Sequence, residues 1–167
     1  MAKKFEDYFA ELQTDMLEIC LEYIEERAEK IFIYCSCESG VIAGAFFFQI
    51  NGGIWNKHKV NDALKPGETP YDVSEERQDA AITIVNDDIA KIKKLCAENG
   101  REMPTQMKIV HDVPRNNFNA DYRYDLVYTN HPYKTDYTIF EEWVQEEANK
   151  LKNNMSQNSR RNINEHN

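Results

Sequence analysis

The residues whose types and spacing could support chemistry are cysteines and histidines. Cys35 and Cys37 flank Ser36, and because alternate residues of a strand point the same way, both thiols could bind one metal ion. A structural zinc takes four ligands, and the sequence offers neither a second close cysteine pair nor a close histidine pair. We therefore interpret both as buried strand thiols and predict no metal site. Cys20 and Cys96 fall on or beside apolar helical faces, where a free cysteine behaves as a small hydrophobic residue.

The four histidines are spread along the chain at His58, His111, His131 and His166, and none forms a close-spaced ligand pattern. His111 and Asp112 could suggest an acid–base pair, but neighbouring strand residues face opposite sides of a sheet. The sequence also contains no nucleophile elbow, phosphate-binding glycine loop or dinucleotide fingerprint. We therefore predict no enzyme and no cofactor. A small hydrolase using His58 or His111 with nearby carboxylates is kept as an alternative.

The charge of the chain favours a basic partner over nucleic acid. The 167 residues carry 29 Asp and Glu against 20 Lys and Arg, a formal net charge of −9. Such a field repels phosphate backbones and attracts basic surfaces, so nucleic acid is not expected as a direct partner. The 41% hydrophobic content, with 11% aromatic residues, favours a folded chain over a disordered one.

The sequence favours a cytoplasmic location. The first residues lead into an acidic amphipathic stretch instead of the apolar run of a signal peptide. The longest apolar run, residues 41–48, is too short to span a bilayer, so no membrane contact is predicted. Four cysteines without a disulfide pattern fit a reducing compartment.

Three amphipathic segments predict helices. From residue 5 to about residue 30, apolar residues recur at alternating spacings of four and three, which places them on one face. A second helix follows a cap at Asp72 or Ser74 and stops before Gly100, where glycine can close a helix in the left-handed conformation. A third helix packs inward around Trp143 and is acidic on its outer face.

Alternating polarity, bounded by turn residues, predicts the strands. They fall at residues 31–37, 41–50, 54–60, 107–113 and 118–124. The resulting order α-β-β-β-α-β-β-α predicts an α+β fold, in which one antiparallel sheet of about five strands carries helices packed on a face. We expect a single domain over residues 1–152 and a polar, disordered tail over residues 153–167.

Tyrosines and carboxylates gather in residues 122–137. Tyrosine is enriched in protein interfaces, so this segment is a candidate binding surface. A half-buried strand covered by a loop explains the same residues equally well. The sequence leaves both interpretations open.

Several local patterns occur together over about residues 5–150. They are the acidic first helix before Lys30-Ile-Phe-Ile-Tyr34, the loop over residues 61–72, the helix end Glu98-Asn-Gly100, the strand after Pro104-Thr105, and Phe118-Asn-Ala-Asp121-Tyr122-Arg-Tyr124-Asp125. Together they resemble the YezG-like family of bacterial antitoxin or immunity proteins. The chain departs from the family pattern in having Asn116-Asn117 where a Gly-Lys turn is common and in lacking a tryptophan after the proline.

The resemblance implies an intracellular immunity protein that binds and neutralises a cognate toxin. Such toxins are often nucleases of contact-dependent or specialised-secretion systems, and their basic clefts would attract an acidic partner. Its expected contact residues are the carboxylates and tyrosines near the loop, the second helix and the last strand. They are Glu68, Asp72, Asp87, Asp88, Asp121, Tyr122, Tyr124 and Asp125.

The main alternative is a non-enzymatic adaptor or scaffold. It would bind another cytosolic protein through the aromatic and acidic surface of residues 122–137. The stoichiometry and the oligomeric state are left open by the sequence.

Overall fold

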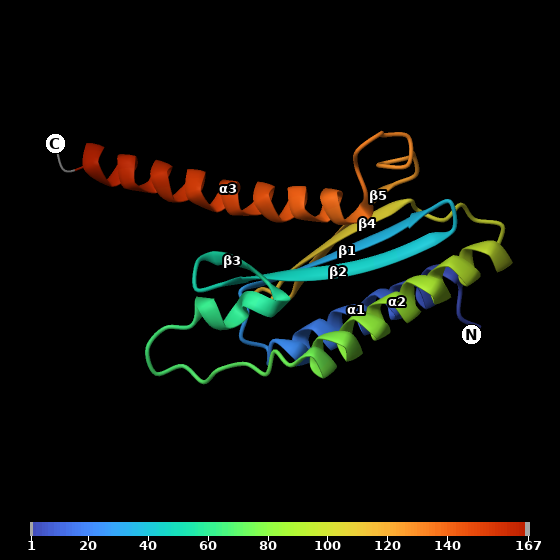
Figure 1. Ribbon diagram of the computed structural model, residues 1–167, viewed down its shortest axis with the longest axis horizontal. Coiled ribbons are helices and arrows are strands. Elements are labelled where there is room, and N and C mark those ends of the chain that lie inside the picture. Colours follow the sequence, from blue (N-terminus) through green and yellow to red (C-terminus); the bar gives the residue numbers. More distant parts are fainter. Residues whose placement is uncertain (1, 166–167) are drawn as a thin grey trace.

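The computed structural model describes residues 2–165 as one sheet between two helical layers. Figure 1 shows α1 and α2 side by side on one face of the sheet and α3 on the other face. The predicted α+β class and element order are confirmed. The helices cover both faces of the sheet rather than one.

The elements have the following bounds. The helices are α1 (Phe5–Tyr23), α2 (Glu75–Glu98) and α3 (Asp136–Asn164), with a short 3₁₀ helix η1 (Lys57–Ala63). The strands are β1 (Lys30–Glu38), β2 (Val41–Ile50), β3 (Gly53–Asn56), β4 (Gln106–Asp112) and β5 (Asn117–Arg123). The sheet is antiparallel throughout, in the order β3-β2-β1-β4-β5.

The central strand β1 divides its side chains between two cores. Ile31 and Ile33 belong to the larger core, under α1 and α2. Phe32 and Tyr34 point the other way and pack with Trp143 of α3. The period-two pattern of the sequence therefore records a strand that is buried on both faces.

The first helix is shorter than the periodicity predicts. It ends at Tyr23, and Glu25 and Glu26 have positive φ angles of 54° and 57°. Arg77 of α2 donates from Nη2 to the carbonyl oxygens of Glu22 and Tyr23, at 2.9 Å and 3.2 Å. The Glu22 carbonyl also accepts from the Glu25 amide at 3.1 Å, so the turn after the helix and a distant arginine together satisfy the helix end.

The third strand is also shorter than predicted. It covers only Gly53–Asn56, and the chain then winds into η1 instead of continuing to residue 60. This winding buries Val60 in the larger core, and the Tyr23 hydroxyl donates to the Lys57 carbonyl at 2.8 Å. A period-two pattern cannot distinguish such a short 3₁₀ turn from a strand end.

The last helix continues where the sequence pattern predicts a disordered tail. α3 runs to Asn164, and every described residue after Leu151 is exposed. No proline or glycine occurs after Pro132, so nothing in the sequence stops the helix. Leu151 is the last described residue of α3 that is partly buried, and the domain boundary at residue 152 stays a prediction. Within residues 2–165, no helix is both long and apolar enough to cross a membrane.

Gly44 of β2 allows α2 to approach the sheet closely. A Cβ atom there would lie 2.7 Å from Val85 Cγ1 and 2.8 Å from Asn86 Oδ1. We expect Gly44→Ala to lower the free energy of unfolding by about 2 kcal/mol, because overpacking displaces neighbouring side chains. Urea titration measures this change, and an unaltered midpoint would contradict the close packing of α2 against β2.

Candidate functional site

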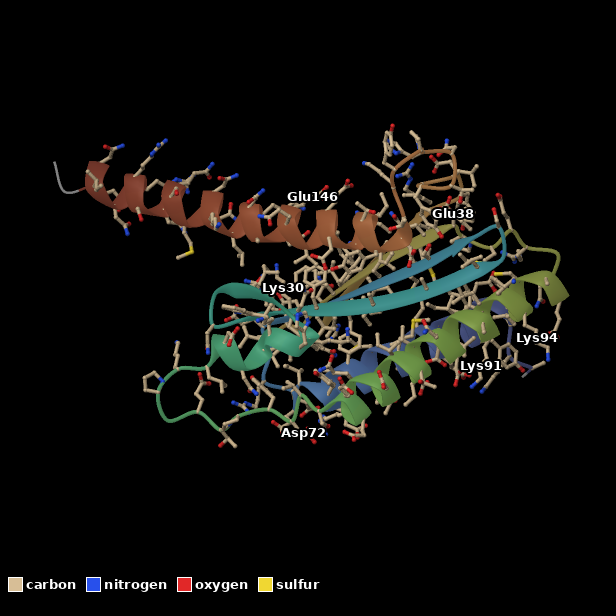
Figure 2. All side chains as sticks on the ribbon, viewed as in Figure 1. Lys30, Glu38, Asp72, Lys91, Lys94 and Glu146 are labelled. Atoms are coloured by element: carbon tan, nitrogen blue, oxygen red, sulfur yellow. The ribbon has the colours of Figure 1, made fainter. Side chains whose placement is uncertain are left out.

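The eight predicted contact residues lie in three separate places. Glu68 and Asp72 belong to the segment between η1 and α2, and Asp87 and Asp88 lie in the middle of α2. The remaining four, Asp121, Tyr122, Tyr124 and Asp125, lie on β5 or directly after it. Figure 2 shows Asp72 at the lower edge of the view, near the start of α2, and Glu38, the residue that anchors the segment following β5, at the upper right. The eight residues therefore do not form one surface.

Glu68 and Asp72 have structural partners. Glu68 accepts hydrogen bonds from the Lys65 amide at 2.6 Å and from Asn51 Nδ2 at 2.8 Å, and these bonds lower the pKa of its carboxyl. The Ser74 amide donates to Asp72 at 3.0 Å and likewise lowers its pKa. Both carboxylates stabilise the turns of this segment and lie far from the predicted tyrosines.

Asp88 is not available to a partner, because only 1% of its surface is exposed. Burial, together with the neighbouring carboxyl of Asp15, raises its pKa to about 7. Asp87, the next residue, is exposed on the outer side of α2. Asp88 is therefore a core residue and Asp87 a surface residue, so Asp88 is not a contact residue for a partner.

Tyr122 and Tyr124 line a groove of about 450 Å³ between the start of α1, the end of α2 and β5. We call this the α1–β5 groove. Its walls are mainly aromatic and apolar, with a few polar side chains at the rim. The residues used below are Phe5, Phe9, Gln13, Arg101, Tyr122 and Tyr124.

Side-chain contacts fix the walls of the groove. Gln13 donates from Nε2 to the Tyr122 hydroxyl at 2.8 Å, and the Phe9 and Tyr122 rings meet edge to face at 6.0 Å. The Arg101 guanidinium lies 4.5 Å from the centre of the Phe5 ring and forms a 3.1 Å ion pair with Glu6. Aromatic rings held in this way lose little entropy when a partner binds.

A network at the end of β5 holds the tyrosines in place. Thr105 donates from its hydroxyl to the carbonyls of Arg123, at 3.1 Å, and Asp125, at 2.6 Å. The Arg123 guanidinium binds both carboxylate oxygens of Asp125, with 3.0 Å between Nε and Oδ1, and lowers the pKa of that carboxyl. Tyr124 lies between these two residues and is therefore held by both.

The segment after β5 is anchored by a buried carboxylate that the sequence pattern assigns to a turn. Glu38 is 2% exposed and accepts hydrogen bonds from the amides of Val127, Tyr128 and Thr129, at 3.1 to 3.4 Å. The sequence feature that could have indicated this burial is the position of Glu38 at the end of the apolar strand β1. Phe5 and Phe9 fall on the apolar face that the sequence predicts for the first helix, and no sequence pattern indicated Gln13 or Arg101.

The candidate histidines lie away from the groove. His111 is buried on the α1–α2 side of β4, where burial lowers its pKa and its Nδ1 atom has no hydrogen-bond partner. His58 is exposed on η1, and His166 lies outside the described residues. Cys35 is buried beside Met16, with 3.7 Å between the sulfur atoms. Across residues 2–165, no group of three or more His, Cys, Asp or Glu side chains is placed to hold a metal ion.

Comparison with known proteins adds no constraint on the function. No protein-family model and no curated protein sequence matches this chain. The resemblance to YezG-like immunity proteins therefore stays a prediction, and the α1–β5 groove is a candidate on its geometry alone.

Proposed function

We propose that this protein binds another protein through the α1–β5 groove and acts as an immunity protein for a bacterial toxin domain. The observation that carries the proposal is the groove itself: a concave aromatic surface, open to solvent, on a rigid helix and strand. Rigid aromatic side chains next to a polar rim are the composition of a protein-binding hot spot. The toxin assignment comes from the family resemblance.

Charge supports a basic partner. The outer face of α1, which begins at the groove, carries exposed carboxylates with few basic residues between them. They are Glu6, Asp7, Glu11, Asp15, Glu18 and Glu22. A basic nuclease domain would be steered towards this face, which raises the rate of association. We therefore expect the carboxylates of α1 to contribute more to steering than Glu68 and Asp72, which lie on the 64–74 segment.

Co-expression with a toxin tests the proposal directly. A toxin-like protein encoded beside this gene should stop growth alone, and growth should return when this protein is co-expressed and forms a stable complex with it. Continued killing without a complex would reject the immunity function. An adaptor, the alternative, would bind a protein whose activity does not affect growth, so the same experiment separates the two.

The two groove tyrosines supply a quantitative prediction. We expect the double variant Tyr122→Ala, Tyr124→Ala to weaken toxin binding at least about tenfold, because both rings lie in the groove. Isothermal titration calorimetry measures the dissociation constant, with circular dichroism as a check of folding. The matched control is Tyr133→Ala, Tyr137→Ala, which removes two tyrosines that are 87% and 68% exposed away from the groove. Equal losses in both double variants would rule the groove out as the contact surface.

A further inference from the structure

The sheet has two edges, and the longer unpaired strand lies at β5. This strand has seven residues and pairs only with β4. At the other side β3 pairs with only residues 47–50 of β2 and passes directly into η1, so residues 41–46 of β2 also have no strand beside them on that side. An unpaired edge presents a row of main-chain donors and acceptors to any strand that can lie against it.

The pairing pattern identifies which groups of β5 are free. Main-chain groups of alternate residues in an antiparallel strand point to opposite neighbours. The Cys37 amide donates to the Thr105 carbonyl at 2.9 Å, so odd-numbered residues of β4 face β1 and even-numbered residues face β5. Lys108 lies opposite Asp121, so the odd-numbered residues of β5 face β4. The residues with outward main-chain groups are Phe118, Ala120 and Tyr122.

We propose that β5 pairs with β5 of a second copy of this chain, antiparallel, with Ala120 opposite the partner's Ala120. The two sheets then become one continuous sheet around a two-fold axis, and each strand supplies the same surface to the other. In this register Phe118 lies opposite the partner's Tyr122, and Tyr122 opposite the partner's Phe118. These rings are 39% and 40% exposed in the single chain, and aromatic cross-strand pairs stabilise antiparallel sheets.

The opposite face of β5 is self-complementary in the same register. Asn119 lies opposite the partner's Asp121, where the amide can donate to the carboxylate. Asn117 lies opposite the partner's Arg123. Among the directly opposed pairs of residues 117–123, no charged residue faces a like charge, even though each chain carries a formal net charge of −9.

Other registers of this strand pair fit less well. A shift of one residue sets each residue with outward main-chain groups opposite a partner residue whose groups point to its own β4, so the hydrogen bonds cannot form. A shift of two residues in one direction sets Asp121 against the partner's Asp121, which is unfavourable. A shift of two in the other direction moves Tyr122 and Arg123 beyond the partner's strand. The symmetric register about Ala120 is therefore selected by charge and by strand length together, independently of any toxin.

Purified protein is sufficient for the first test. Light scattering at increasing concentration should show a mass that rises from 19.6 kDa towards twice that value. Added salt should strengthen the dimer, because the two acidic chains repel each other less when their charges are screened. Ala120→Pro should stay monomeric, since proline removes an outward N–H while keeping the bonds to β4. A wild-type mass that stays at one chain at every concentration would overturn the proposal.

Disulfide trapping tests the register and does not depend on how Ala120→Pro folds. Directly opposed residues of a non-hydrogen-bonded pair have Cα atoms about 4.5 Å apart, within reach of a disulfide. The double variant Asn119→Cys, Asp121→Cys should therefore oxidise to a covalent dimer. The control Asn117→Cys, Asp121→Cys places its thiols out of register and should remain monomeric. The natural cysteines are all buried and do not interfere. Equal cross-linking of the two variants, or none in the first, would overturn the register.

Discussion

Replacing Glu38 by alanine is expected to lower the free energy of unfolding by about 3 kcal/mol, because three main-chain amides lose the carboxylate that accepts their hydrogen bonds. These amides, of Val127, Tyr128 and Thr129, are part-buried, and each donates to the Glu38 carboxylate. Urea unfolding measures the loss. Hydrogen exchange at the three amides should accelerate more than exchange in β1, since the segment is released locally before the whole domain unfolds.

Two further variants sharpen this prediction. Glu38→Gln keeps an acceptor oxygen but removes the charge. Its free energy of unfolding should therefore lie between the values of wild type and Glu38→Ala. Glu98→Ala, at an exposed helix end, should change stability by no more than about 0.5 kcal/mol. If Glu38→Ala resembles Glu98→Ala, the carboxylate does not hold the segment. If the Glu38 carboxylate does hold the segment, Glu38→Ala should also weaken binding at the groove, because Tyr124 directly precedes the released segment.

The fold was predictable wherever the sequence pattern reported burial directly. The alternation in β1, the helix cap at Ser74 and the helix end before Gly100 all reappear in the structure, because each depends on neighbours in the chain. The errors depend on distant residues. α1 ends early because Arg77 caps its last carbonyls, and β3 ends early because the chain turns to bury Val60. Contacts of this kind leave no local pattern.

The candidate site was predictable only in part, for a related reason. The tyrosines at the end of β5 and directly after it stand out by type, so the sequence predicts Tyr122 and Tyr124 as contact residues. The other wall of the groove comes from α1, more than a hundred residues earlier, and Phe9 looks like any core residue of an amphipathic helix. Acidic residues were the weakest guide. Glu68 and Asp88 share a charge with Asp125, but one stabilises a turn and the other is buried in the core.

Replacing Asp88 by asparagine should stabilise the protein above neutral pH. The carboxyl lies between α1 and α2, where burial first and Asp15 second raise its pKa from 3.8 to about 7, while Lys91 opposes and Asp87 adds to the shift. Glu11 and Lys94 line the same gap between the helices. One carboxylate oxygen of Asp88 has no hydrogen-bond partner. An ionised group in this position therefore weakens the packing of the two helices.

The pH dependence follows from the direction of the shift. Below pH 3.8 both the folded and the unfolded chain hold the proton on Asp88, so the residue costs no stability through ionisation. As the pH rises to about 7, the unfolded chain releases this proton first, and the free energy of unfolding falls. Asp88→Asn removes this dependence. Its advantage over wild type should be small near pH 4 and reach roughly 2 to 4 kcal/mol at pH 8.

The comparison that decides this prediction is the difference between variant and wild type across pH, because other titrating groups then largely cancel. Urea unfolding at a series of pH values gives both curves. Asp87→Asn, an exposed neighbour on the same helix, should follow wild type within about 0.5 kcal/mol throughout. Parallel curves for wild type and Asp88→Asn would mean that the buried carboxyl titrates normally. Diverging curves would mean that the α1–α2 pair, which forms one wall of the groove, is held most firmly when Asp88 keeps its proton.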